Sequence, residues 1–166
     1  MNEEFCATLQ ARLEEATGGE RYPNKATGSD IPPTVYRTQM PLRAEDYTEG
    51  INAPVVIWCI TGGEMTGRGL VAELETRIDC ITWTPAGIVE GSADINRLTE
   101  SVLALAHVRA FAGLRLGDIR WSMGSEQDTV NTVKGRQPHP YYESHLYFTF
   151  TAPAPQPRCR TQAKGD

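Results

Sequence analysis

The stretch from Gly69 to Met123 constrains the fold of this chain more than any other part. Residues 70–83 alternate between two faces, one largely apolar and the other charged in its middle, and this period of two predicts a half-buried strand. After a glycine-containing turn, apolar residues recur at spacings of three and four within 94–111, which predicts an amphipathic helix with its N-cap at Ser92 or Asp94. Because this helix has one face to bury, a sheet covered by a helix is the expected core.

The other segments complete an α+β domain over residues 1–151. A first amphipathic helix is expected from Asn2 to about Glu15, followed by a glycine stop. Further strands are predicted at 54–61, 114–123 and 141–150, with long polar loops at 22–33, 41–52 and 124–138. The expected fold class is therefore a mostly antiparallel β-sheet packed by two amphipathic helices. The side chains expected in its core are Trp58, Leu74, Ile78, Leu98, Val102, Leu105, Leu146 and Phe148. Residues 152–166 are proline-rich without an apolar face, which predicts a flexible, disordered tail.

Charge and composition exclude several classes of protein. The 166 residues carry a net charge of −5 and no basic block that could follow a phosphate backbone, so direct nucleic-acid binding is not expected. The longest apolar run, residues 53–60, is far too short to span a bilayer. Glu3 and Glu4 stand where a signal peptide would carry positive charge. These features favour synthesis in the cytoplasm and no membrane partner.

The four cysteines, Cys6, Cys59, Cys80 and Cys159, have none of the paired spacings of metal sites or redox motifs. Cys59 and Cys80 lie within apolar strands and are interpreted as small core residues. A disulfide between these two is geometrically conceivable if their strands are neighbours, although a reducing compartment argues against it.

The glycine-rich segment 62–69 allows two interpretations. Four glycines in eight residues could suggest a phosphate-binding loop. However, the segment lacks the Gly-Lys-Ser/Thr ending and precedes a strand, whereas a phosphate-binding loop opens a helix. We therefore interpret it as the tip of a β-hairpin that joins strands 54–61 and 70–83.

Catalytic and metal-binding motifs are not recognisable in the sequence. No nucleophile elbow, His-Glu-x-x-His pair or Cys/His signature is present. A metal site built from His139, His145 and a carboxylate is an open alternative, but the spacing lacks the pattern of a zinc site. His107 is interpreted as a solvated or partly packed helix residue, and Asp118 and Glu126 as surface charges. The sequence therefore favours a protein that is not an enzyme and needs no cofactor.

The order of elements and several local sequences resemble the phage tail terminator (tail completion) family. The resemblance covers nearly the whole chain apart from its last sixteen residues, and no single motif in it is diagnostic. The segments that carry it are the opening helix ending at Tyr22-Pro23, the strand Pro54-Val-Val-Ile-Trp58, the return strand 70–84, the helix 94–111, the strand ending Arg120-Trp121, and the closing segment 137–150.

The resemblance implies an α+β subunit that forms a homohexameric ring on the head-proximal end of the tail tube. Such a ring stops tube polymerisation and presents a joining surface to the head connector, so its partners are its own copies, the tail tube protein and a connector or neck protein. The implied location is the neck of the virion, reached from the host cytoplasm during assembly. The long loop 124–138 and the proline-rich tail depart from a minimal family member. They leave open a head–tail joining or other neck protein of the same fold. A small-ligand-binding or enzymatic domain is the alternative from another class.

Mixed charges in long loops on a rigid sheet suit a polar, reversible interface. We therefore hypothesise that a set of charged residues contacts neighbouring subunits or the tube, with plain solvation of the loops as the alternative. This set consists of Arg68 at the hairpin tip and Glu126, Asp128, Lys134 and Arg136 in the long loop.

Overall fold

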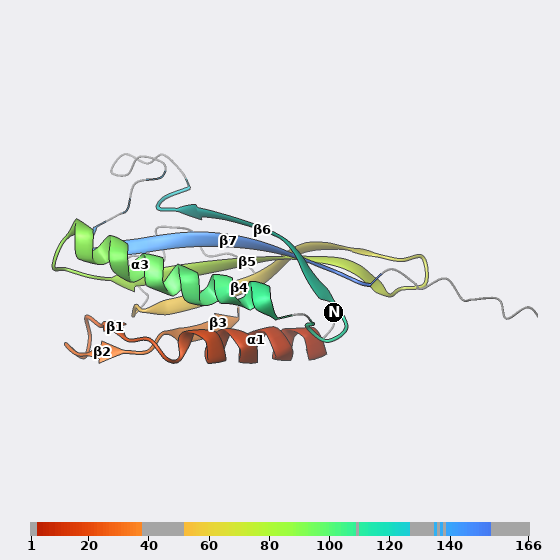
Figure 1. The fold of residues 1–166 in the computed structure, drawn as a ribbon, viewed down its shortest axis with the longest axis horizontal. Helices are drawn as coiled ribbons and strands as arrows, with labels where there is room; N and C mark the ends of the chain where they lie inside the picture. Colours follow the sequence, from red (N-terminus) through yellow and green to blue (C-terminus); the bar gives the residue numbers. More distant parts are fainter. Residues whose placement is uncertain are drawn as a thin grey trace, which may run out of the picture.

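The computed structural model describes residues 3–37, 52–108, 110–126, 135, 137 and 139–153. The described helices and strands, in chain order, are α1 (Glu3–Thr17), β1 (Tyr22–Pro23), β2 (Asp30–Ile31), β3 (Thr34–Arg37), β4 (Val55–Met65), β5 (Val71–Trp83), α3 (Ile88–Leu103), the 3₁₀ helix η1 (Ala104–His107), β6 (Arg115–Met123) and β7 (Tyr141–Thr151). The predicted α+β fold, a mostly antiparallel sheet packed by two helices, is confirmed (Figure 1). From residue 154 on, the predicted tail lies outside the described residues.

The main sheet has five strands in the order β3-β4-β5-β7-β6, and β1 pairs with β2 in a separate two-stranded sheet. Strand β3 runs parallel to β4, and every other pair in the main sheet is antiparallel. The predicted hairpin of β4 and β5 is present, and β7 lies between β5 and β6. This register places residues that are far apart in the sequence directly opposite each other, among them Asp79 and His145.

The helices cover one face of the sheet and form the main core with it. Helix α1 packs on β3 and α3, and α3 packs on β5 and β7 (Figure 1). All eight side chains predicted to be buried are at most 8% exposed, because the apolar positions of the strands and helices meet in this layer. The other face carries a smaller apolar cluster of Ala53, Val55, Ile57 and Ile81, so β4 is buried on both faces, as predicted for a central strand.

Helix α3 begins earlier than the sequence predicts. It starts at Ile88 with Gly87 as its N-cap, so neither Ser92 nor Asp94 caps it, and it gives way to η1 after Leu103. The apolar stripe that reveals this helix begins only at Ile95, and Gly91 before it favours a turn in the sequence pattern. Asp94 instead accepts a hydrogen bond from the Thr84 hydroxyl at 2.7 Å, which ties the helix to the end of β5.

The hairpin of β4 and β5 is longer than predicted because Gly62 and Gly63 continue the strand. The turn itself is closed by two hydrogen bonds, from the Thr66 amide to the Leu70 carbonyl and from the Gly69 amide to the Thr66 carbonyl. Gly69 has a φ of 74°, which favours glycine at this position. Figure 1 shows that the end of the hairpin extends beyond both helices. We call this projecting part, residues 62–74, the arm.

Cysteines 6, 59 and 80 are buried free thiols, which confirms the core positions predicted for Cys59 and Cys80. Cys80 belongs to the core under the helices, as do Val56 and Trp58 of β4. Because side chains alternate along a strand, Cys59 points to the opposite face from Trp58, so a disulfide between Cys59 and Cys80 is excluded. Cys159 lies outside the described residues.

Replacing Gly91 with alanine is expected to destabilise the protein although it should favour the helix. In an exposed helix, Gly to Ala stabilises by roughly 1 kcal/mol. A Cβ atom at Gly91, however, would overlap the ring of the buried Tyr142, and such overpacking costs about 1–3 kcal/mol. Denaturant unfolding measures the change, with Asn96→Ala on the exposed face of α3 as the control. A more stable Gly91→Ala variant would contradict this packing.

Candidate interaction surfaces

The arm ends in side chains that protrude into solvent. Met65 and Leu70, which flank its turn, are 67% and 66% exposed, and Arg68 in the turn is exposed. The structure therefore places Arg68 at the hairpin tip, as the sequence predicts. This charge stands between two exposed apolar side chains, so the tip is amphipathic. No periodicity in the sequence reveals that Met65 and Leu70 are exposed.

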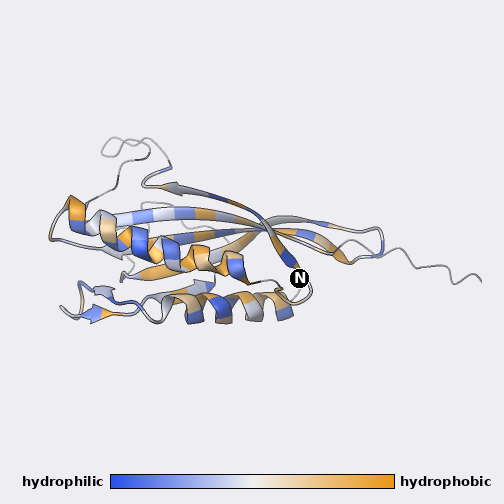
Figure 2. Cartoon of the chain, in the orientation of Figure 1, coloured by the Kyte–Doolittle hydropathy of each residue, from blue (hydrophilic) through white to orange (hydrophobic). Residues whose placement is uncertain are grey.

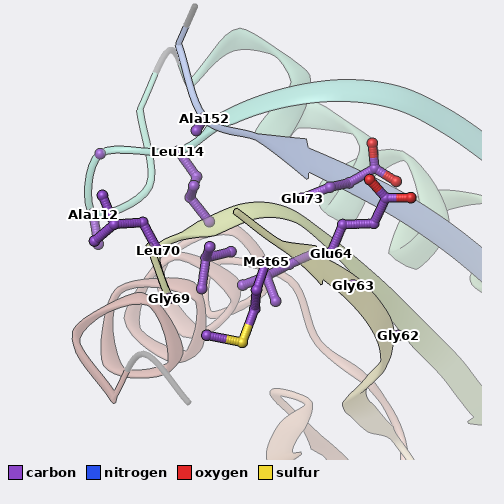
Figure 3. A pocket seen from close by; sticks show the side chains of 13 residues that line it. Gly62, Gly63, Glu64, Met65, Gly69, Leu70, Glu73, Ala112, Leu114 and Ala152 are labelled. Atoms are coloured by element: carbon purple, nitrogen blue, oxygen red, sulfur yellow. The ribbon is translucent and has the colours of Figure 1, made fainter. Parts of the chain in front are cut away.

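A groove runs along the base of the arm and encloses about 660 Å³. One wall is the arm itself, and the other is the turn that leads into β6 together with the end of β7 (Figure 3). The apolar side chains that line it are Met65, Leu70, Val71, Leu74, Ala112, Leu114 and Ala152. Figure 3 shows Leu114 pointing toward the arm. Glycines 62, 63 and 69 open the groove because they add no side chains to its wall.

Two carboxylates mark the rim of this groove. Glu64 and Glu73 lie directly opposite each other in the ladder of β4 and β5, and their side chains lie side by side in Figure 3. Like charges in such a position repel each other, and neither carboxylate forms a salt bridge within the described part of the chain. The groove is thus apolar inside and negative at its edge.

The sheet face opposite the helices carries a buried polar network centred on Asp79. Asp79 accepts hydrogen bonds from Arg77 Nε at 2.8 and 3.0 Å, and His145 Nδ1 donates to its Oδ1 at 2.6 Å. The side chains of Asp79 and His145 are each only 3% exposed. A buried charge is stable only when it is paired, so Arg77, Asp79 and His145 hold one another in fixed orientations.

Glu126, a predicted interface residue, takes part in this network within its own subunit. Its carboxylate pairs with Arg77 at 3.1 Å and accepts a hydrogen bond from the Tyr147 hydroxyl at 2.6 Å. The interpretation of Glu126 as a plain surface charge is therefore wrong, because the β5–β7 register brings Arg77 and Tyr147 to it. The other predicted interface residues of this loop, Asp128, Lys134 and Arg136, lie outside the described residues.

Burial and charge act in opposite directions on the pKa values of this network. Burial alone would raise the pKa of Asp79, but the hydrogen bond from His145 and the charge of Arg77 outweigh it and lower that pKa. Burial alone would lower the pKa of His145, but its bond to Asp79 and the nearby carboxylates of Glu126 and Glu143 raise it. For Glu143, burial prevails and raises the pKa. The pair of Asp79 and His145 is thus biased toward its ionised form.

The described side chains do not assemble a metal or nucleophile site. His139 is exposed and packs edge-on against Tyr142, a residue of the core under the helices, whereas His145 faces the opposite side. Within the described residues no group of three metal-ligating side chains converges. Asp79, His145 and Ser122 do lie in a row across three strands, but the buried His145 Nε2 has no hydrogen-bond partner in the described part of the chain. Ser122 is therefore not held by a base as a triad nucleophile would be.

Stability is expected to depend on the proton of His145. The pKa of His145 is raised in the folded state, so its proton stabilises the folded protein. This stabilisation is complete below the ordinary histidine pKa, near 6.5, and is lost as the pH rises through the pKa of the folded state. The free energy of unfolding should therefore fall between pH 6 and pH 9. In His145→Gln this part of the slope should disappear. Urea unfolding across this pH range measures both proteins, and parallel curves would contradict a charged His145.

Comparison with known proteins adds no relative. No protein-family model matches the chain, and no curated protein matches it. In the described residues, no helix has the length and apolarity needed to cross a membrane. The fold and its surfaces define the class as an α+β domain with a projecting β-hairpin arm.

Proposed function

We propose that this protein is a phage tail terminator. In this role it forms a ring, homohexameric as the resemblance implies, on the head-proximal end of the tail tube, stops tube polymerisation and provides the joining surface for the head connector. It acts by binding and not by catalysis. Its expected partners are further copies of itself, the tail tube protein and the connector or a neck protein, first in the host cytoplasm and then in the virion neck.

The observation that carries this proposal is the arm. A rigid sheet holds it clear of the helical layer, and its exposed apolar tip and open groove are surfaces that suit contact with another molecule (Figure 1). The ends of the molecule also differ in shape and chemistry, which a cap needs if it binds the tube on one side and offers a different surface on the other. The resemblance in the order of elements adds support to the same reading.

Immunogold labelling of intact phage particles tests the proposed location. Antibodies against this protein should place gold at the junction of head and tail. Gold along the tube or on the capsid would contradict the proposal. A head–tail joining protein of the same fold, the alternative function, would also place gold at the junction. The length of tails that form without the protein distinguishes a terminator from a joining protein.

A further inference from the structure

We propose that the free protein pairs with a second copy of itself through strand β6, which lies antiparallel to β6 of the other copy. The two-fold axis of this pair passes between the two Ile119 residues. A two-fold contact joins two copies and ends there, so this pairing is a property of the free protein and does not rest on the proposed ring.

The main sheet has one open edge within the described part of the chain. At the β3 edge, the side-chain amide of Gln10 on α1 donates a hydrogen bond to the Val35 carbonyl at 3.1 Å, so the helix occupies that edge. At the other edge, β6 has β7 as its neighbour on one side, and none of its nine residues is buried. Figure 1 shows β6 along the margin of the sheet that lies away from α1. Such an unpaired edge is a template that another strand can join.

Alternate residues of β6 turn their backbone toward this open edge. The Gly124 amide donates to the Glu143 carbonyl at 2.8 Å, so the ladder with β7 uses the backbone of every second residue counted back from Gly124. The amide and carbonyl groups of Met123, Trp121 and Ile119 therefore point away from β7. These groups are placed to form the hydrogen bonds of an antiparallel pair with a further strand.

Two-fold symmetry restricts the register of such a pair. Residues directly opposite each other in an antiparallel pair lie on the same face of the sheet. A two-fold axis perpendicular to the sheet keeps each residue on its own face, so one residue must lie opposite its own copy. An axis at Asp118 or at Arg120 would place like charges opposite each other, which is destabilising. An axis at Ile119 instead places Asp118 of each copy opposite Arg120 of the other.

This register makes both faces of the contact complementary. Asp118 and Arg120 flank Ile119 on the face opposite the helices, are exposed, and form no salt bridge within the described part of the chain. On the helix face, the register shift between Leu116 and Ile119 brings Leu116 of one copy opposite Trp121 of the other, which is 56% exposed. In Figure 2 the strand accordingly carries both hydrophilic and hydrophobic colour. Pairing removes the exposed apolar area from water.

The charges of β6 also select the partner. Charged residues on an edge strand usually keep other strands away. On β6 the two charges nearest the axis have opposite signs and stand two positions apart, so a strand of the same sequence in this register meets attraction at both. An axis at Trp121 would leave the Asp118 carboxylates without an opposite charge. The matching partner is therefore a second copy of this chain, paired about Ile119.

Charge reversal tests the register. Asp118→Arg alone places positive charges opposite each other, and Arg120→Asp alone places negative charges opposite each other, so each should raise the Kd of the pair by about tenfold or more. The double variant Asp118→Arg with Arg120→Asp restores opposite charges and should pair like the wild-type chain. Lys25→Asp, at an exposed position outside β6, is the control and should leave the Kd unchanged. Sedimentation equilibrium measures the Kd, and circular dichroism checks that each variant is folded.

A mixture of the two single variants gives the decisive result. One carries two negative and the other two positive charges at these positions, so they should form a mixed pair although each alone pairs weakly. Hydrogen exchange at the Ile119 and Trp121 amides should be slow in the wild-type pair and fast in either single variant alone. A wild-type chain that stays monomeric up to about 1 mM overturns the inference. Single variants that associate like the wild type, or a double variant and a mixture that do not recover pairing, overturn it as well.

Discussion

Replacing Asp79 with alanine is expected to lower the free energy of unfolding by about 3–5 kcal/mol, the cost of breaking a buried ion pair by removing one partner. Asp79 is 2% exposed and lies between two potential cations. Arg77 Nη2 is 3.2 Å from His145 Nδ1, and without the carboxylate these groups face each other with no anion between them. Glu126 remains beside Arg77 but makes no contact with His145 that could replace Asp79.

Equilibrium unfolding in denaturant at pH 6, where His145 is protonated, measures this effect. Glu75→Ala removes the same carboxyl group from an exposed position of the same strand and should change the free energy by less than about 0.5 kcal/mol. Asp79→Asn keeps the shape and part of the hydrogen bonding, so it should lie between the two. Equal stability of the Asp79 and Glu75 alanine variants would show that the network contributes little to the fold.

The sequence predicts the apolar layers of this protein well. The alternation in 70–83 and the helical spacing in 94–111 predict which side chains face the core, because the apolar positions of a periodic segment are the ones that become buried. Trp58, Leu98 and Phe148 are therefore found where they are expected, each at most 1% exposed. The start of α3 was missed because Ile88 and Val89 face solvent, so this turn adds nothing to the apolar stripe.

The buried polar network was not predictable from local pattern. Asp79 and His145 are 66 residues apart, and only the register of β5 against β7 places them opposite each other. The charged positions of β5 predict a polar face, although Ile81 on the same face is buried. Ile81 and Trp83, both apolar and on this face, are the signals in the sequence that the face is covered in part.

The groove also depends on contacts that no local sequence encodes. The glycines of the arm predict a hairpin tip, but the second wall comes from Ala112 and Leu114, about forty residues further along the chain. Whether Met65 and Leu70 are exposed depends on how far the hairpin extends past the helices, which is a property of the assembled fold. The sequence therefore located the arm without revealing its apolar surface.

Under the proposed function, deleting the gene for this protein from its phage is expected to yield tails of normal diameter but uncontrolled length that fail to join heads. A tail tube grows because each ring exposes a surface that accepts the next, and a head-to-tail contact of this kind continues until a different molecule covers the end. A cap that binds through one surface and displays another ends this growth without any chemical step. Tube diameter should be unchanged, because a cap binds only the end of a tube that has already formed.

Electron microscopy of lysates measures tail length and the fraction of joined particles, and a plasmid copy of the wild-type gene should restore both. A plasmid copy with Asn96→Asp, at an exposed position of α3, is the control for a neutral surface change and should restore them equally. Tails of normal length that still fail to join heads would favour the head–tail joining alternative. Complete infectious particles formed without this protein would contradict both functions, because neither growth control nor joining would then depend on it.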